Sequence, residues 1–139
     1  MLRAVISETE AYVAGDLANH ACYGPTRKNW TMFSGPGHLY VYHIHRYFCA
    51  NVTTVPGEAV LLRVAVADPP WNARLGGPGL LCQGLEISRE QDGIDLTTSR
   101  EVHIAHRKIA PDPIVVRKRV GIRYAQDAPL RFVASVEDA

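Results

Sequence analysis

The sequence predicts an α+β domain dominated by a curved antiparallel β-sheet, with a protruding β-hairpin and few short helices. Three observations lead to this class. Several short segments alternate apolar and polar residues and are rich in β-branched and aromatic side chains. Gly, Pro and Asn separate these segments, as expected of turns between antiparallel strands. Apolar residues recur at helical spacing in only one short stretch.

The first half of the chain is expected to hold one strand, a long loop and a hairpin. A strand is predicted from Leu2 to Ser7, and Glu8-Thr9-Glu10 follows at its end. Residues 13–37 are rich in Gly, Pro, Asn and Thr, which predicts a long surface loop. Residues 39–54 are dense in Tyr, Val, Ile, Phe and Thr, and the polar stretch 43–46 in their middle predicts a hairpin tip.

The second half is expected to add further strands and one short helix. Pro56-Gly57 and Asp92-Gly93 predict turns. The three prolines and three glycines of residues 68–79 predict a loop, and apolar residues at helical spacing predict a helix over 79–87. Further strands are predicted over residues 59–67, 102–109, 114–124 and 130–134.

The length and composition favour one globular domain. The chain has 139 residues, of which 47% are apolar and 21% charged, so a single domain over residues 1–139 is expected. No apolar run approaches the roughly 20 residues that a membrane span needs, and residues 1–4 lack the pattern of a secretion signal, so a secreted form is not expected. Cys22, Cys49 and Cys82 form no C-x-x-C pair, which favours a reducing, intracellular compartment.

The net charge does not by itself indicate a nucleic-acid partner, because it is only +1. Basic residues are nevertheless concentrated locally at Arg27-Lys28, Arg107-Lys108 and Arg117-Lys118-Arg119. Each of these groups is either a solvated face or a contact to phosphate, and the sequence leaves both interpretations open.

Two carboxylates are candidates for acid–base chemistry. Glu8 and Glu10 are two residues apart at the expected strand end, so their side chains share a face of the sheet. A carboxylate at the mouth of a cleft is the usual position of a general base. The alternative is that both are solvated at a strand terminus, which is the common environment of glutamate.

Aromatic and imidazole side chains gather around the expected hairpin. Tyr12, Tyr40, Tyr42 and Tyr47 form either a stacking pocket for a planar ligand, such as an unstacked base, or ordinary strand packing. His43-x-His45, with His20 and His38 in the preceding loop, could be read as a zinc site. That signal is weak, because no further ligands recur at metal spacing, so no metal is expected.

Arg63 is the one charged residue in an apolar strand segment, 59–67. A guanidinium in such a place is rarely left unpaired, since burying it alone is costly. We therefore expect a buried carboxylate or anion nearby, and Glu10 is the attractive candidate. The alternative is an edge strand on which Arg63 points to water.

Taken together, these segments resemble the alkyladenine (3-methyladenine) DNA glycosylase family of the mammalian type. The matching segments occur in the family's order along most of the chain, and the set is highly specific although no single one is decisive. They are Ser7-Glu8-Thr9-Glu10-Ala11-Tyr12, Ala18-Asn19-His20, Met32-Phe33, Pro36-Gly37, Leu39-Tyr40-Val41-Tyr42, Cys49-Ala50-Asn51-Val52, Ala59-Val60-Leu61-Leu62-Arg63, Gly77-Pro78-Gly79, Leu81-Cys82-Gln83, Asp92-Gly93-Ile94-Asp95-Leu96 and Arg119-Val120-Gly121-Ile122.

The resemblance implies a monofunctional DNA glycosylase that hydrolyses the base–sugar bond of a damaged purine, such as an alkylated adenine or hypoxanthine. It implies that Glu10 is the general base for the attacking water and that Arg63 helps to hold this water and the carboxylate. Tyr12 and Tyr42 are implied to stack on the flipped base, and His20 to hydrogen-bond one of its edges. No lysine takes the place of the nucleophile, so no strand cleavage is expected.

The resemblance also assigns specificity and DNA contacts. Asn51 matches a position that clashes with the 2-amino group of guanine, and the backbone near Ile122 matches a stretch that lines the water site. His45 is expected to intercalate where the flipped nucleotide leaves the stack. Thr26, Arg27 and Lys28 are expected to contact the DNA backbone. The partner is then double-stranded DNA with damaged purines, bound by a monomer without a cofactor.

Two departures from the family pattern stand out. The family places a bulky, often aromatic residue at the hairpin tip, and an imidazole such as that of His45 is a smaller wedge. The family also has extra chain before the first matched strand and a longer, partly helical segment in place of residues 68–76. We expect these departures to bear on the affinity of the protein for DNA and on the stability of its fold.

Two other functions are compatible with the sequence. One is a nucleic-acid-binding module of the same fold with little or no turnover. The other is a small metal-dependent hydrolase that uses His43 and His45. Release of a base from lesion-containing DNA separates the enzyme from the binding module, and insensitivity to a chelator separates it from the metal enzyme.

Overall fold

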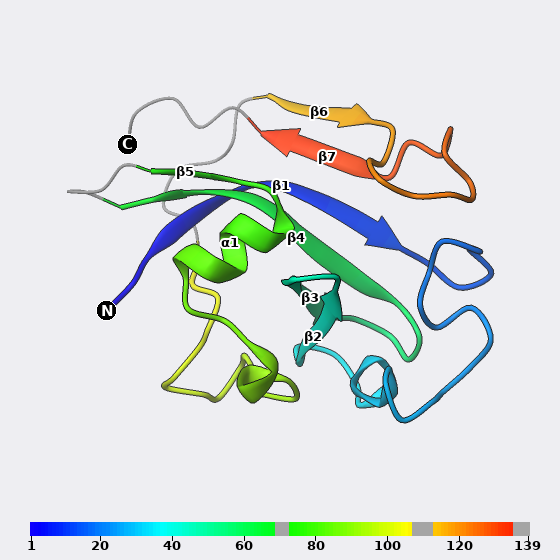
Figure 1. Ribbon diagram of the computed structural model, residues 1–139, viewed down its shortest axis with the longest axis horizontal. Coiled ribbons are helices and arrows are strands. Elements are labelled where there is room, and N and C mark those ends of the chain that lie inside the picture. Colours follow the sequence, from blue (N-terminus) through cyan, green and yellow to red (C-terminus); the bar gives the residue numbers. More distant parts are fainter. Residues whose placement is uncertain (69–72, 107–112, 135–139) are drawn as a thin grey trace.

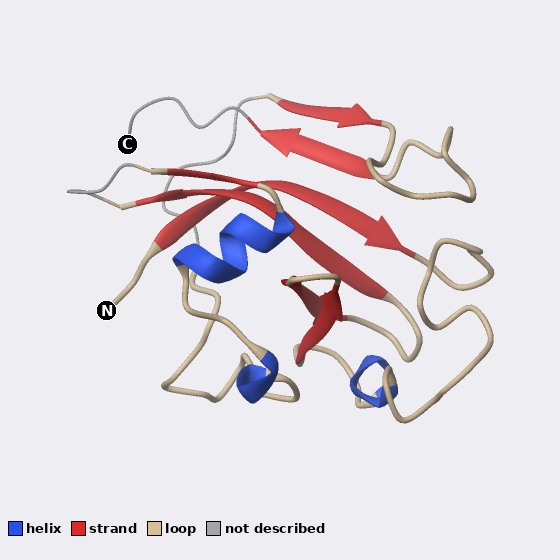
Figure 2. Cartoon of the chain, in the orientation of Figure 1, coloured by secondary structure: helices blue, strands red, loops and turns tan. Residues whose placement is uncertain are grey.

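The computed structural model describes residues 1–68, 73–106 and 113–134. Their strands form one antiparallel sheet, accompanied by one α-helix and two short 3-10 helices, which confirms the α+β class (Figures 1 and 2). The elements are β1 (Ala4–Tyr12), η1 (Trp30–Phe33), β2 (Leu39–Ile44), β3 (Tyr47–Thr53), β4 (Ala59–Ala67), β5 (Arg74–Gly76), α1 (Pro78–Gly84), η2 (Arg89–Gln91), β6 (Ile114–Arg117) and β7 (Arg131–Ala134).

The sheet has the order β2-β3-β4-β1-β7-β6, and the short β5 pairs with β4. The long strands β1 and β4 lie side by side and curve across the molecule, and the β2–β3 hairpin stands at their side (Figure 1). β1 is therefore a central strand, because it pairs with β4 on one side and with β7 on the other. Its register shifts near Glu8, where the pairing with β4 is irregular.

The two faces of the β2–β3 hairpin have different environments. Leu39 and Val41 belong to a buried cluster with Leu81 and Cys82 of α1. The side chains that alternate with them, Tyr40 and Tyr42, lie on the other face near the long loop after β1. α1 begins close to the hairpin, since a Cβ at Gly79 would come 2.6 Å from the ring of Tyr47.

The first strand is longer than predicted. β1 continues through Glu8 and Glu10 to Tyr12, because residues 8–12 pair with β4 and residues 8–10 also with β7. The two carboxylates therefore lie within a strand and not at its end. The long loop was predicted correctly apart from η1, as were the hairpin, the turns and the helix, which ends earlier than expected. The loop expected over residues 68–79 is wrong at residues 74–76, which form β5 by pairing with β4, and at residues 78 and 79, where α1 begins. Residues 69–72 lie outside the described residues. η2 was not predicted.

The expected strand 114–124 is wrong beyond Arg117, and so is the expected strand 102–109 within residues 102–106. Residues 107–109 lie outside the described residues. Within the expected strand, Gly121 has a positive φ of 72°, which extended strand residues do not adopt. The segment 118–130 instead forms a loop that reaches across to β1. None of the helices in the described part of the chain is long and apolar enough to cross a membrane.

Candidate active site

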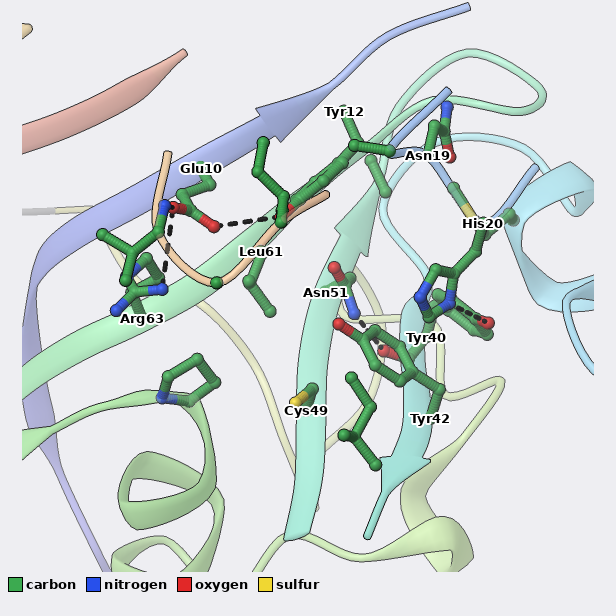
Figure 3. A pocket seen from close by; sticks show the side chains of 18 of the residues that line it. Glu10, Tyr12, Asn19, His20, Tyr40, Tyr42, Cys49, Asn51, Leu61 and Arg63 are labelled. Carbon is green, nitrogen blue, oxygen red and sulfur yellow. Dashed lines mark hydrogen bonds and ion pairs between the residues drawn. The ribbon is translucent and has the colours of Figure 1, made fainter. Parts of the chain in front are cut away.

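A cavity of about 330 Å³ lies between β1, the β2–β3 hairpin, β4 and the loop that follows β6 (Figure 3). Glu10 and Arg63 lie at one end of the view in Figure 3, and His20 lies with Tyr40 and Tyr42 at the other. The residues that line the cavity are Glu10, Tyr12, Leu17, Ala18, Asn19, His20, Met32, Tyr40, Tyr42, Ile44, Cys49, Asn51, Ala59, Leu61, Arg63, Pro78, Val120, Gly121, Ile122, Arg123 and Tyr124.

Glu10 is fully buried, and both of its carboxylate oxygens have hydrogen-bond donors. The hydroxyl of Tyr12 donates to Oε1 over 3.0 Å, and the backbone N–H of Val120 donates to Oε2 over 2.7 Å. Nη1 of Arg63 lies 3.6 Å from the same Oε2. Hydrogen bonds of this kind fix the orientation of a buried carboxylate. The interpretation of Glu10 as a solvated strand-end residue is therefore wrong.

Arg63 is held by Glu8 as well as by Glu10. Its Nε donates to Oε2 of Glu8 over 3.2 Å, and Nη1 of Arg131 lies 3.4 Å from the other oxygen of Glu8. The side chain of Arg63 is only 14% exposed, and β4 lies between β3 and β1. The edge-strand alternative is therefore wrong, and the expectation of a buried carboxylate partner is confirmed.

The opposite end of the cavity is aromatic. The rings of His20 and Tyr42 pack with centroids 4.1 Å apart, and Nδ1 of His20 lies 3.4 Å from the hydroxyl of Tyr40. Burial lowers the pKa of His20, so the imidazole is neutral near neutral pH and offers one donor and one acceptor. Burial also raises the pKa of Tyr40 to about 12, so this phenol keeps its proton.

Tyr12 and Tyr42 are uncharged for the same reason. Burial raises the pKa of both hydroxyls above the ordinary range, and for Tyr12 the negative charge of Glu10 adds to the effect. Both rings line the cavity, whereas Tyr47 is 56% exposed and packs over α1. Of the four tyrosines that could have formed a stacking pocket, three line it.

Asn51 lies in the wall formed by β3 and is almost fully buried. Its Nδ2 donates to the backbone oxygen of Tyr40 over 3.3 Å, across the pairing of β2 with β3. The side-chain oxygen points away from this bond in Figure 3. The carboxamide therefore satisfies a backbone group and also faces the cavity.

The loop after β6 closes the cavity on the side of Glu10. Val120, Gly121 and Ile122 all line it, but the backbone donor to Glu10 is Val120 and not the stretch at Ile122. The carbonyl of Ile122 accepts a hydrogen bond of 3.2 Å from the side chain of Gln126. Ile122 is thus brought to the site as a lining residue.

The remaining candidates lie outside the cavity. His45 is exposed at the tip of the β2–β3 hairpin, with a positive φ of 52°. Thr26, Arg27 and Lys28 are exposed in the loop after β1, where the side chain of Asn29 accepts a hydrogen bond of 2.6 Å from the N–H of Thr26. Surface positions of this kind are available to a large ligand but not to one inside the cavity.

Residues 1–68, 73–106 and 113–134 contain no group of three or more His, Cys, Asp or Glu side chains that could hold a metal ion. His43 packs against Phe48, with ring centroids 5.2 Å apart. His38 is within 3.1 Å of the carbonyl oxygen of Gly35. These contacts occupy two of the histidines considered for zinc.

Comparison with known proteins shows the family of this chain. Residues 1–138 match the family model of methylpurine-DNA glycosylase (MPG). The chain belongs to the methylpurine-DNA glycosylase family. It is accordingly a DNA glycosylase, a hydrolase that acts on N-glycosyl bonds with DNA as its substrate.

Three relatives of this methylpurine-DNA glycosylase share the name "Putative 3-methyladenine DNA glycosylase". The protein of Wolbachia pipientis wMel is 40% identical over 133 residues, which cover 92% of this chain and 73% of the relative. That of Synechococcus sp. (strain JA-3-3Ab) is 41% identical, covering 94% and 78%. That of Rhizobium etli is 38% identical, covering 91% and 69%.

The candidate site and its surroundings also contain residues to which the sequence assigned no individual role. Tyr40 was considered only as one ring among four, and neither the donor at Val120 nor the buried Arg119 beside it was proposed. A backbone N–H has no side-chain signature, so Val120 could not be found from its residue type. Arg119 stood within a basic triplet, but only the fold shows that it is 5% exposed while its neighbours Arg117 and Lys118 are exposed.

Proposed function

We propose that this glycosylase flips a damaged purine out of duplex DNA into the cavity and hydrolyses its N-glycosidic bond with a water that Glu10 activates. The observation that carries the proposal is the buried carboxylate of Glu10, oriented by two hydrogen-bond donors and by the guanidinium of Arg63 at the end of an aromatic cavity. A carboxylate has about four acceptor sites, and the hydrogen bonds from Tyr12 and Val120 fill two of them, so about two remain for a water.

Glu10 takes a proton from the water as the water's oxygen bonds to the anomeric carbon. The bond between this carbon and the purine nitrogen breaks, and its electron pair leaves with the base. The negative carboxylate also stabilises the oxocarbenium-like charge that develops on the sugar. Alkylation or deamination makes the purine a better leaving group, so a positioned water suffices. The product is an abasic site in an uncut strand.

The cavity is suited to holding a planar purine. Tyr12 and Tyr42 offer ring faces for stacking, and the neutral His20 can accept or donate a hydrogen bond at one edge of the base. Asn51 places a carboxamide in the wall, where it would crowd a 2-amino group. We infer that alkylated adenine and hypoxanthine are accepted and that normal guanine is refused.

Contacts outside the cavity would hold the duplex. His45 at the hairpin tip would enter the space that the flipped nucleotide leaves, and Ile122 would complete the wall beside the water. Thr26, Arg27 and Lys28 are exposed and would contact phosphates. We further propose that the enzyme acts as a monomer, as one domain over residues 1–139, inside the cell.

The test is base release from duplexes that contain hypoxanthine or alkylated adenine, followed by alkali to cleave abasic sites. Strand cleavage only after alkali, unaffected by a chelator, is the expected result. Glu10→Gln keeps the shape and removes the charge, so excision should fall by at least about a hundredfold. Binding of lesion DNA should survive in this variant.

Near-normal excision by Glu10→Gln would remove Glu10 from the mechanism. Lesion-DNA binding without release of any base, by the unaltered protein, would support the binding-module alternative instead. Loss of activity with chelator would favour the metal-dependent hydrolase.

A further inference from the structure

Arg119 is a buried cation on the loop after β6, directly before the residue that donates to Glu10. It is 5% exposed and forms a buried ion pair with Asp16 of the loop after β1, with a second hydrogen bond of 3.1 Å from Nη2 to Oδ1. Burial raises the pKa of Asp16, but the hydrogen bonds from Arg119 and from the N–H of Ala18 outweigh it and hold that pKa below its ordinary value. Both groups are therefore charged at neutral pH.

The same guanidinium joins the two chain segments through their backbones. Nη1 donates to the carbonyl of Ala11 in β1 over 3.2 Å, and Nη2 donates to the carbonyl of Ala125 over 3.3 Å. Arg119 thus ties the end of β1 to both ends of the short loop segment 119–125. That segment contains Val120, whose N–H reaches Glu10 over 2.7 Å.

Arg119 also supports Tyr12. Its guanidinium carbon lies 4.9 Å from the centroid of the Tyr12 ring. Arg119 is not among the lining residues of the cavity, whereas Tyr12 is. The cation therefore lies over the ring without lining the cavity, and the attraction between a cation and an aromatic face helps to hold the ring in place. The hydroxyl of this tyrosine is the second donor to Glu10.

Stability alone does not explain this arrangement. A buried ion pair adds little net stability to a fold, because the cost of desolvating both charges offsets their attraction. Within the described residues, Nε of Arg119 is a buried donor with no hydrogen-bond partner, which adds to the cost of burying this side chain. The contacts that Arg119 does make converge on the two donors to Glu10.

We propose that Arg119, paired with Asp16, is a positioning residue that sets the Val120 N–H and the Tyr12 hydroxyl on the carboxylate of Glu10. It does not touch the substrate. This inference rests on the proposed function of Glu10 as the base. A donor displaced by a fraction of an ångström would leave the carboxylate misaligned for the attacking water, so the rate of the chemical step should depend on Arg119.

The experiment measures the single-turnover rate of hypoxanthine excision at saturating enzyme, and separately the dissociation constant for the lesion duplex. Arg119→Met should lower the rate by about tenfold or more and change the dissociation constant by less than about threefold. Arg119→Lys keeps the charge but loses the bidentate contact with Asp16, so its rate should lie between the rates of the unaltered protein and of Arg119→Met. Asp127→Asn is the matched control, because it breaks the exposed ion pair of 3.1 Å with Lys118 on the same loop. Its rate should stay within about twofold.

The double variant Asp16→Asn with Arg119→Met guards against misfolding, since it leaves no buried charge unpaired. A rate loss in this variant at an unchanged melting temperature supports the proposal. A normal rate in it, or in Arg119→Met, overturns the proposal. Glu10→Gln in the same assay separates the two levels: excision that survives Glu10→Gln refutes the proposed function itself, whereas excision lost in Glu10→Gln but kept in the Arg119 variants refutes only this inference.

Discussion

Glu8 accepts a hydrogen bond of 3.2 Å from Nε of Arg63, whereas Nη1 of the same guanidinium lies 3.6 Å from Glu10. The two carboxylates of β1 therefore share one guanidinium but differ in their surroundings. Glu10 is fully buried and also receives a backbone donor, whereas Glu8 is 12% exposed in its side chain and has Arg131 as its second partner. Their positions favour a base at Glu10 and an orienting group at Glu8.

Neutralising Glu8 should therefore weaken catalysis without abolishing it. In Glu8→Gln the bond to Nε of Arg63 loses its charge, and Arg63 becomes free to turn toward Glu10. We expect the single-turnover rate of excision to fall by about tenfold, well short of the hundredfold expected for Glu10→Gln. Equal losses in the two variants would contradict the division of roles.

Asn51 should control the choice between guanine and hypoxanthine. Asn51→Ala removes the carboxamide that we expect to crowd the 2-amino group, so release of normal or alkylated guanine should rise relative to hypoxanthine. The measurement is the ratio of the two rates in one variant. If Asn51 serves only to satisfy the carbonyl of Tyr40, to which it donates over 3.3 Å, both rates will fall together and the ratio will not change.

The size of the ring at position 45 should determine the affinity of the protein for lesion DNA. His45→Tyr should tighten binding, since stacking of a base on an aromatic ring contributes about 1–3 kcal/mol in other systems. His45→Asn should weaken it, and asparagine is a suitable control because it tolerates the positive φ of 52° while removing the ring. Affinities that are equal in all three proteins would show that this side chain does not intercalate.

His20 should make the stability of the fold depend on pH in the weakly acidic range. Burial lowers its pKa below the ordinary 6.5, so over this window the unfolded chain binds more protons than the folded chain. The stabilisation is complete above pH 6.5 and is lost as the pH falls through the folded pKa. His20→Gln cannot titrate, so the difference in unfolding free energy between the unaltered protein and this variant should be larger at pH 8 than at pH 5. A difference that is constant with pH would argue against a neutral, buried imidazole.

The sequence was sufficient where local pattern and chemistry coincide. A single arginine among the apolar residues 59–67 required a buried anion, and Glu10 is that anion. The aromatic strands with a polar centre at 43–46 required a hairpin, and β2 and β3 form it. In both cases the physical demand could be read within a few neighbouring residues.

It was insufficient where the deciding partner is distant in the chain. The end of β1 was placed too early because the pairing of Glu8 and Glu10 with β7 cannot be read from residues 2–12. Residues 114–124 have a strand-like composition, yet Arg119 leaves the sheet to reach Asp16, 103 residues earlier. Val120 donates through its backbone, so its residue type gave no indication of its position in the site.

The hydrogen bond from Val120 to Glu10 spans 110 residues, and this separation has a consequence for synthesis. A chain that grows from its N-terminus exposes Glu10 early, together with the tyrosines of β2, but it cannot close the cavity until residues beyond β6 have left the ribosome. The wall beside Glu10 therefore cannot assemble before residue 120 has been synthesised, and contacts between residues so far apart in a chain are slow to form in general. A nascent glycosylase is thereby kept from presenting a finished site before translation has passed Val120.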